Sequence, residues 1–282
     1  MTKQVVNHSE TVNLSSQRVW LEGVINAREL GGYMNRDGKK IKGGKILRSG
    51  QLYAATSQDK KVLNEDYNVG SIIDFRSDFE TIPQPDPPIL GAQHYDFPVL
   101  EFKFTSREQQ KLQQINEESS QGERLLLLAE AGMTADTGIY ERIMFGEPAK
   151  KAYKRFFELL LENDSEHSVL FHCTQGKDRT GIAAAMLLTM LDFSDELILS
   201  DYMLTNKANS DIIHEDIKAV SEYTDDEVII DSVRRMNGVS EHLLEYAFSK
   251  ARVEYGSVRE YIVKTYDLSE ADIYELKHKY LC

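Results

Sequence analysis

The hydrophobic residues of this chain fall into two kinds of pattern: short runs suited to strands and longer runs with helical spacing. Runs rich in β-branched and aromatic residues, bounded by turn residues, predict four core strands, at residues 45–48, 71–75, 93–97 and 168–172. Residues 150–161 instead carry apolar side chains at helical spacing, at Tyr153, Phe156, Phe157 and Leu160. This spacing predicts a helix with one face packed against the core and its basic residues in solvent.

The rest of the pattern indicates helices and loops. From residue 194 onward the chain is charged, with helical spacing and few strand signals, so we expect helices there. Four of the six prolines lie in residues 83–88, which predicts a loop because proline fits neither a helix interior nor a central strand. Residues 107–132 are expected to form an excursion with a short helix of its own.

Strands that alternate with helices, followed by a helical tail, are typical of an α/β fold. We therefore predict a central, mostly parallel sheet flanked by helices. A length of 282 residues allows one large domain. We expect a single domain over residues 1–282, with a core at about 20–205 and a helical elaboration or lid at about 206–282.

Charge and hydropathy exclude several classes of protein. Lys and Arg number 33 against 46 Asp and Glu, which gives a formal charge of −13 and a pI near 5.1. A nucleic-acid binder needs a basic surface, so no nucleic-acid partner is expected. The longest apolar run, residues 181–191, is shorter than the roughly 18 residues of a membrane span, so no integral membrane association is expected.

Cysteine and histidine usage bears on compartment and cofactors. Two cysteines, Cys173 and Cys282, are too few for a disulfide framework. The first twenty residues contain no apolar stretch long enough for a signal peptide. We expect a cytoplasmic protein, with secretion by a route without a signal peptide left open. The histidines lack metal-ligand spacing, so we expect neither a metal nor another cofactor.

The stretch from Ser168 to Leu188 combines a predicted strand, a polar loop and an apolar helix. The strand ends at His172, the loop spans residues 173–177, and the helix begins near Arg179. The first N–H groups of a helix have no intrahelical partner and carry partial positive charge, so this arrangement suits a phosphate. The expected phosphate-binding residues are Thr174, Gln175, Gly176, Lys177, Asp178 and Arg179.

Several of these side chains, with their neighbours, have a chemical use. The loop amides and the helix terminus favour the thiolate of Cys173, which makes it a candidate nucleophile. Arg179, six residues later, can fork two phosphate oxygens. Gly176 lets the backbone curl around an anion, Lys177 adds a second cation, and Thr180 is placed to hydrogen-bond the sulfur. The alternative interpretation is an inert buried thiol at a strand end.

The motif His172-Cys-x5-Arg-Thr resembles the active-site signature of the cysteine-dependent tyrosine and dual-specificity phosphatases. The longer His-Cys-Thr-Gln-Gly-Lys-Asp-Arg-Thr-Gly is similar to the loop of the bacterial atypical tyrosine phosphatases, which are related to phosphoinositide phosphatases. Further blocks similar to that family follow in the expected order, at Asn26-Ala-Arg-Glu-Leu-Gly-Gly, Ile46-Leu-Arg-Ser-Gly-Gln-Leu, Ile72-Ile-Asp-Phe-Arg-Ser and Glu254-Tyr-Gly-Ser, with Tyr261 downstream. The resemblance covers about residues 20–280 and implies the cysteine-phosphatase fold.

The general acid lies elsewhere than in the best-known tyrosine phosphatases. Their acid is on a Trp-Pro-Asp loop, whereas the one tryptophan here, Trp20, is followed by Leu-Glu. Two candidates are Asp178, within the motif, and Asp74, at a predicted strand end. The resemblance favours Asp178 as the acid and Asp74 as the residue that orients Arg179. For Asp74 the alternative is an ordinary ion pair with a neighbour such as Arg76.

Residues 26–32 are interpreted mainly as structure. Gly31-Gly32 suggests a turn that needs positive φ, and Arg28 is a candidate for a structural ion pair.

These observations favour a phosphomonoester hydrolase that works through a cysteinyl-phosphate intermediate without metal. Phosphotyrosine in proteins is the expected substrate, with phosphoserine, phosphothreonine and phosphoinositide also open. Two other classes stay as alternatives. A catalytically inactive phosphate-binding module would typically have lost the cysteine or the arginine. A rhodanese-like sulfurtransferase is disfavoured by the Cys-to-Arg spacing and by the hydroxyl after Arg179.

Overall fold

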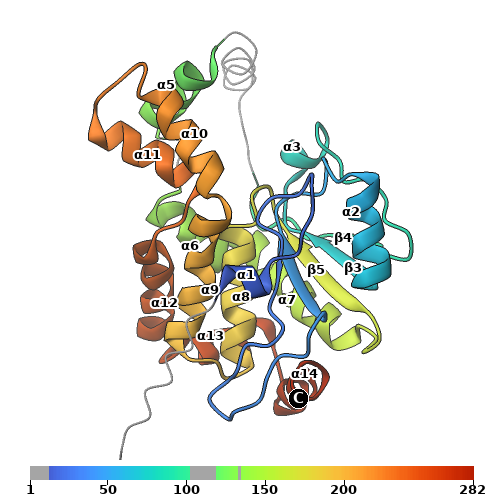
Figure 1. Cartoon of the computed structure of the whole chain (residues 1–282). Helices are drawn as coiled ribbons and strands as arrows, with labels where there is room; N and C mark the ends of the chain where they lie inside the picture. Colours follow the sequence, from blue (N-terminus) through green and yellow to red (C-terminus); the bar gives the residue numbers. More distant parts are fainter. Residues whose placement is uncertain (1–12, 102–118, 133–134) are drawn as a thin grey trace, which may run out of the picture.

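The centre of the molecule is a five-stranded sheet in the order β1-β2-β5-β3-β4 (Figure 1). The computed structural model describes residues 13–101, 119–132 and 135–282. The strands are β1 (Arg28–Glu29), β2 (Ile46–Ser49), β3 (Val69–Asp74), β4 (Gln93–Asp96) and β5 (Ser168–His172). Strand β1 is antiparallel to β2, and the other neighbours are parallel. The predicted mostly parallel sheet is confirmed, and so are the four predicted strands; β1 was not predicted.

The two faces of the sheet contribute to two separate hydrophobic cores. Successive strand residues point to opposite faces, so Ile73 and Phe171 enter the larger core while Ile72 and Leu170 enter the smaller one. The smaller core is closed by Leu63 of the π-helical turn η1 (Val62–Asp66), which directly follows α2 (Ser57–Lys61). The larger core is covered by helices.

Within the part of the chain that the structure describes, seven helices contribute buried side chains to the larger core. They are α6 (Thr137–Phe145), α7 (Glu147–Glu162), α8 (Asp178–Met190), α9 (Asp195–Ala208), α12 (Glu241–Tyr255), α13 (Val258–Tyr266) and α14 (Glu270–Tyr280). The helix predicted at 150–161 lies within α7. Its four predicted core residues are buried, and Phe156 makes edge contacts with Phe75, Phe157 and Phe171. Lys151 and Arg155 on its other face are exposed, as predicted.

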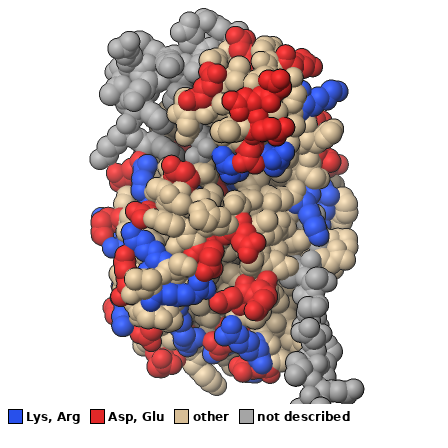
Figure 2. Space-filling view, turned by 90° about the vertical axis from the view of Figure 1, so that its left-hand side faces the viewer, with Lys and Arg blue, Asp and Glu red and all other residues tan. Residues whose placement is uncertain are grey.

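Three further helices form a hydrophobic cluster of their own away from the sheet. They are α5 (Gln121–Glu130), α10 (Ser210–Val220) and α11 (Glu227–Asn237), packed around Leu125, Val220 and Val233. We call them the outer helical unit; Figure 1 shows it at the upper left. On the face turned toward the viewer, Figure 2 shows acidic side chains gathered over this end of the molecule.

The outer helical unit refines the predicted helical elaboration. Helices α12–α14 pack into the larger core, so within residues 206–282 only α10 and α11 stand apart with α5. Helix α5 is the short helix predicted within the 107–132 excursion, and residues 107–118 lie outside the described residues. Residues 83–88 form the predicted loop after the short helix α3 (Asp78–Thr81).

The other short helix, α1 (Leu14–Gln17), begins the described chain. Among the described helices, none combines the length and the apolar character that crossing a bilayer requires.

Candidate active site

The loop of residues 173–177, here called the phosphate loop after its predicted ligand, joins the carboxyl end of β5 to the first turn of α8. Strand β5 is the central strand of the sheet, so the loop lies at the middle of the carboxyl edge. Cys173 begins the loop and is 2% exposed. Gly176 has a φ of 64°, and a Cβ there would lie 2.3 Å from the carbonyl oxygen of Ser49. The predicted need for glycine at this curl therefore has two causes, the backbone angle and the close approach to β2.

Side-chain donors hold the carbonyl groups of the phosphate loop from behind. The Nδ2 group of Asn26 donates to the carbonyl oxygens of Gln175 (3.1 Å) and Gly176 (2.9 Å). The Nη2 group of Arg48 also donates to the carbonyl oxygen of Gly176, at 3.0 Å. Because these carbonyls are fixed toward Asn26 and Arg48, the loop is preorganised, and successive backbone N–H groups in such a curl form an anion-binding concavity.

A buried ion-pair network supports these donors. Asp201 of α9 accepts from the Nε of Arg28 (3.1 Å) and the Nη1 of Arg48 (2.5 Å), and all three side chains are buried. Arg28 also donates to the Oδ1 of Asn26. Burial opposes the charge of Asp201, yet Arg28 and Arg48 lower the pKa of its carboxyl. Two guanidinium groups share one carboxylate, so a net positive charge lies behind the phosphate loop.

Sequence reasoning treated residues 26–32 mainly as a structural turn, and the structure agrees in part. Gly32 has the expected positive φ, and Arg28 makes the expected ion pair. The contact of Asn26 with the phosphate loop was not predicted, because the two segments are 149 residues apart in sequence.

Arg179 is held in place by a carboxylate that sequence reasoning missed, Glu80 of α3. Its Nη1 and Nη2 groups donate to the two oxygens of Glu80 at 2.7 and 2.6 Å. Nη2 also lies 3.3 Å from the hydroxyl of Thr174, which itself donates to Glu80. Burial disfavours the charge of Arg179, yet Cys173 and Glu80 raise the pKa of the guanidinium above its ordinary value. Arg179 is therefore a fixed cation close to Cys173.

Glu80 is positioned by a local motif that is visible in the sequence. Its Oε2 atom accepts from the backbone N–H of Ser77 at 3.0 Å, which completes a capping box at the start of α3. The signature Ser77-x-x-Glu80 directly after a predicted strand was the signal available. Burial opposes ionisation of Glu80, but the hydrogen bonds and charge of Arg179 lower the pKa of its carboxyl from 4.5 to about 2.

The predicted pairing of Asp74 with Arg179 is not found in the structure. Asp74 makes an ion pair with Arg76 (2.7 Å), the alternative that sequence reasoning kept open, and also accepts from the backbone N–H of Arg76 (2.8 Å). The turn after β3 brings this guanidinium back onto Asp74, while α3 brings Glu80 to Arg179. The expectation for Asp74 is corrected: within the described residues it is not the carboxylate that orients Arg179.

Asp74 belongs to a buried charge cluster behind the nucleophile. Asp86 lies 2.9 Å from the Nε2 of His172 and 2.9 Å from the Nη2 of Arg76. Burial opposes protonation of His172, yet Asp74 and Asp86 raise the pKa of its imidazole. Asp74, Asp86 and His172 are close enough together to hold a metal ion. Arg76 already supplies a positive charge to both carboxylates, so the cluster does not fit a cation.

Asp178, the predicted acid, is the first residue of α8. Its Oδ1 atom accepts from the hydroxyl of Tyr140 at 2.7 Å, and its Oδ2 atom lies 3.4 Å from the Nζ of Lys177. Burial and the charge of Asp178 raise the pKa of Tyr140 well above its ordinary value, so Tyr140 stays a donor. The carboxyl group of Asp178 thus lies at the N-terminus of α8, five residues after Cys173, the candidate nucleophile.

The predicted role of Lys177 as a second cation requires a free ammonium group at the rim of the site. In the structure this group is already hydrogen-bonded. The Nζ group of Lys177 donates to the carbonyl oxygens of Arg235 (2.7 Å) and Gly238 (3.3 Å), just where α11 ends. Gln175 donates to the side chain of Asn237 beside them. The side chains of Gln175 and Lys177 therefore connect the phosphate loop to the end of α11 in the outer helical unit.

The hydroxyl of Thr180 is buried and has no hydrogen-bond partner among the described residues. The predicted hydrogen bond from this hydroxyl to the sulfur of Cys173 is therefore absent from the structure, and this expectation is corrected. The structure thus places Cys173, Asp178 and Arg179 together, on the phosphate loop and the first turn of α8. Glu80 joins them through its ion pair with Arg179, whereas Asp74 pairs with Arg76 instead.

Comparisons with known proteins connect this site to a family. The model of the tyrosine phosphatase family matches residues 19–282. A Cupriavidus necator protein provisionally named a tyrosine-protein phosphatase is 27% identical over 189 residues, a match that covers 66% of this chain and 62% of that protein. This chain therefore spans less than two thirds of the length of the curated relative it matches.

Two solved structures of Siw14 also match the chain. One is titled as the core catalytic domain of a PP-IP phosphatase from S. cerevisiae in complex with citrate, and the other as the Siw14 catalytic core. Both are 16% identical, with a TM-score of 0.36. They cover 74% and 75% of this chain and 91% and 92% of their own.

Replacing Glu80 by Gln is expected to reduce stability in a pH-dependent way. Because the folded-state pKa of Glu80 lies below its ordinary value, its stabilisation is fully present above about pH 4.5 and is lost as the pH falls toward 2. Urea unfolding should show Glu80→Gln less stable than the wild type by up to about 3 kcal/mol at pH 7, with the difference shrinking below pH 4.

Glu65→Gln is the matched control, since Glu65 forms an exposed pair with Lys61; it should show little change at any pH. A stability difference for Glu80→Gln that stays constant from pH 7 to pH 3 would contradict the low pKa of Glu80.

Proposed function

Because the chain belongs to the tyrosine phosphatase family, we propose that it hydrolyses phosphomonoesters through a covalent intermediate on Cys173. The observation that carries the proposal is a buried thiol at the start of a preorganised loop, with a fixed guanidinium close to it in the first turn of α8. Glu80 takes one N–H from each terminal nitrogen of Arg179, and longer bonds run from Nη1 to the carbonyl of Phe75 (3.4 Å) and from Nη2 to the hydroxyl of Thr174 (3.3 Å). The Nε–H group has no hydrogen-bond partner among the described residues, and we propose that it binds a phosphoryl oxygen, with the longer bonds exchanged for phosphoryl contacts when substrate binds.

The proposed reaction has two displacements at phosphorus. In the first, the thiolate of Cys173 forms an S–P bond while the P–O bond to the leaving group breaks, and Asp178 protonates the leaving oxygen. In the second, water attacks phosphorus, the S–P bond breaks, and inorganic phosphate and the thiolate are released. The loop N–H groups and Arg179 stabilise the equatorial oxygens in both transition states.

For the substrate, we propose phosphotyrosine in proteins. The bonds of Lys177 to the backbone of residues 235 and 238 support a simple monoester over a polyphosphate, because two carbonyl groups already engage the ammonium that a second phosphate would need. Phosphoserine, phosphothreonine and phosphoinositide are tested as competing substrates in the same assay. A reducing compartment such as the cytoplasm suits the chemistry, since a thiolate is readily oxidised.

Replacing Cys173 by Ser should abolish release of phosphate from an aryl phosphate, by at least about a thousandfold, because serine is not ionised at neutral pH. Binding of inorganic phosphate should persist, since Arg179 and the loop are unchanged. Cys282→Ser is the matched control, because Cys282 is exposed at the chain end; it should keep full activity, and excess chelator should leave the wild type unaffected.

Measurable turnover by Cys173→Ser would refute the nucleophile assignment. If both cysteine variants lose phosphate binding, the substitutions disturb the binding site as well as the reaction, and the loss of activity then says nothing about the nucleophile. A wild type that binds phosphate but releases none from any monoester would favour the inactive module, and transfer of sulfur from thiosulfate would favour the sulfurtransferase.

Asp178→Asn should slow turnover by about a hundredfold for a substrate with a poor leaving group, and little for an activated aryl phosphate, because only the former needs a proton. The fall of the rate at high pH should also flatten, since it reports loss of that proton. Asp74→Asn should keep the fall, because the carboxylate of Asp74 is paired with Arg76. Steady-state pH profiles of both variants measure this, and the reverse pattern would transfer the acid role to Asp74.

A further inference from the structure

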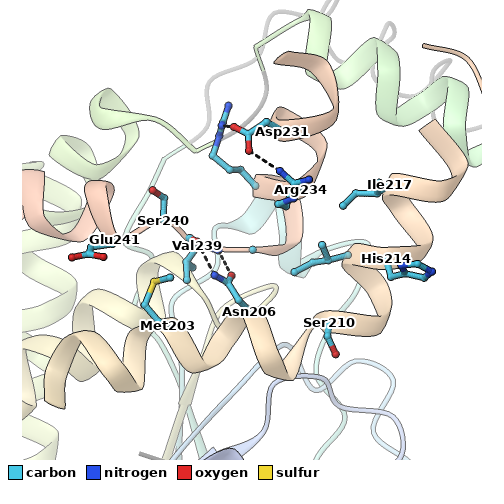
Figure 3. Close-up of a pocket in the computed structure, with 13 residues that line it drawn as sticks. Met203, Asn206, Ser210, His214, Ile217, Asp231, Arg234, Val239, Ser240 and Glu241 are labelled. Atoms are coloured by element: carbon cyan, nitrogen blue, oxygen red, sulfur yellow. Dashed lines mark hydrogen bonds and ion pairs between the residues drawn. The ribbon is translucent and has the colours of Figure 1, made fainter. Parts of the chain in front are cut away.

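A second pocket lies beside the outer helical unit, separate from the phosphate loop. It has a volume of about 530 Å³ and is bounded by α9, α10, α11 and the start of α12 (Figure 3). Volumes of this size are typical of small-molecule sites. No residue of the phosphate loop lines it, so it is not an extension of the candidate active site.

One wall of this pocket is apolar. Met203 of α9, Ile213 and Ile217 of α10, and Val239 of the connector to α12 line it. Figure 3 shows Ile217 directed across the pocket from α10 toward α11, and Met203 and Val239 at the other end. An apolar chain placed here would remove these side chains from water, which is favourable in proportion to the area covered.

The α11 side of the pocket is cationic. Arg234 and Arg235 both pair with Asp231, so two guanidinium groups share one carboxylate and leave a net positive charge. The Arg234 side chain is 50% exposed and is therefore accessible to a ligand. The other acid that lines the pocket, Glu241, lies in Figure 3 on the far side of Val239 from Arg234. An anionic group is favoured only near Arg234.

The segment at the base of the pocket also binds the phosphate loop. Asn206 fixes Val239 with two hydrogen bonds, to its N–H (2.7 Å) and its carbonyl (3.0 Å), which Figure 3 draws as dashed lines. Arg235 and Gly238 line the pocket, and their carbonyl oxygens accept from Lys177 of the phosphate loop. A shift of this segment therefore changes the position of Lys177.

We propose that this pocket binds an amphiphilic monoanion and that its occupancy alters turnover at the phosphate loop. The anionic group lies against Arg234, and the apolar chain lies along Ile213 and Ile217. The coupling runs through residues 235–239 to Lys177. Binding is independent of the proposed function, whereas the coupling rests on it.

Decanoate is the probe, and decan-1-ol is its uncharged control. With the full chain, decanoate should raise Tm in a saturable manner and bind more tightly than decan-1-ol in calorimetric titration. Arg234→Ala should weaken decanoate binding about five- to tenfold, through loss of one charge-assisted contact. Lys218→Ala removes an exposed charge from α10 outside the pocket and should leave the affinity unchanged.

A second variant tests the apolar wall. Ile217→Thr replaces an ethyl group by a hydroxyl, so it removes apolar contact area and should weaken binding of both probes. Absence of saturable binding, equal affinity for the two probes, or unchanged affinity in both Arg234→Ala and Ile217→Thr would overturn the site.

Coupling is measured as the kcat/KM for an aryl phosphate. Saturating decanoate should change this value about fivefold in the wild type, and in Arg234→Ala only at correspondingly higher concentration. Bound decanoate that leaves kcat/KM unchanged would overturn the coupling. An inactive wild type that still binds decanoate would refute the proposed function and leave the pocket assignment intact.

Discussion

The carboxylate of Asp201, shared by Arg28 and Arg48, is the interaction on which the candidate site depends. Through it, α9 and two strands of the sheet fix the donors that hold the carbonyl of Gly176. A loop whose carbonyls are held from behind needs little reorganisation when an anion binds. Removing Asp201 would leave the buried guanidinium groups of Arg28 and Arg48 without the carboxylate they share. Such a loss destabilises a protein far more than the loss of an exposed ion pair.

Charge around the site is arranged in separate pairs, and this arrangement makes the proposed anion binding compatible with an acidic protein. Glu80 serves Arg179, and Asp74 and Asp86 serve Arg76 and His172. Behind the phosphate loop, by contrast, two guanidinium groups share the single carboxylate of Asp201. The formal charge of −13 therefore says little about the local potential at Cys173, where the buried excess of positive charge is shielded from the acidic surface.

The sequence was most informative where function and fold use neighbouring residues. Strand β5, the phosphate loop and the start of α8 are continuous, so spacing alone predicted them. The partners of the charged residues were harder, because Asp74 and Glu80 both follow β3 and only the path of α3 decides which one reaches Arg179. Lys177 was predicted to be a second cation at the rim because its charge is evident from the sequence. The carbonyl groups of residues 235 and 238 that bind it come from a helix end far along the chain, so this contact could not be predicted. The contact of Asn26 with the phosphate loop was not predicted for the same reason.

The central claim is that Cys173 carries the phosphoryl group during turnover. Rapid-quench mass spectrometry of the wild type mixed with excess aryl phosphate tests it most directly. The account predicts one added phosphoryl group on the peptide that contains Cys173, formed before steady state and lost as substrate is consumed. Turnover with the phosphoryl group on another residue, or with none on any residue while product appears, would contradict it.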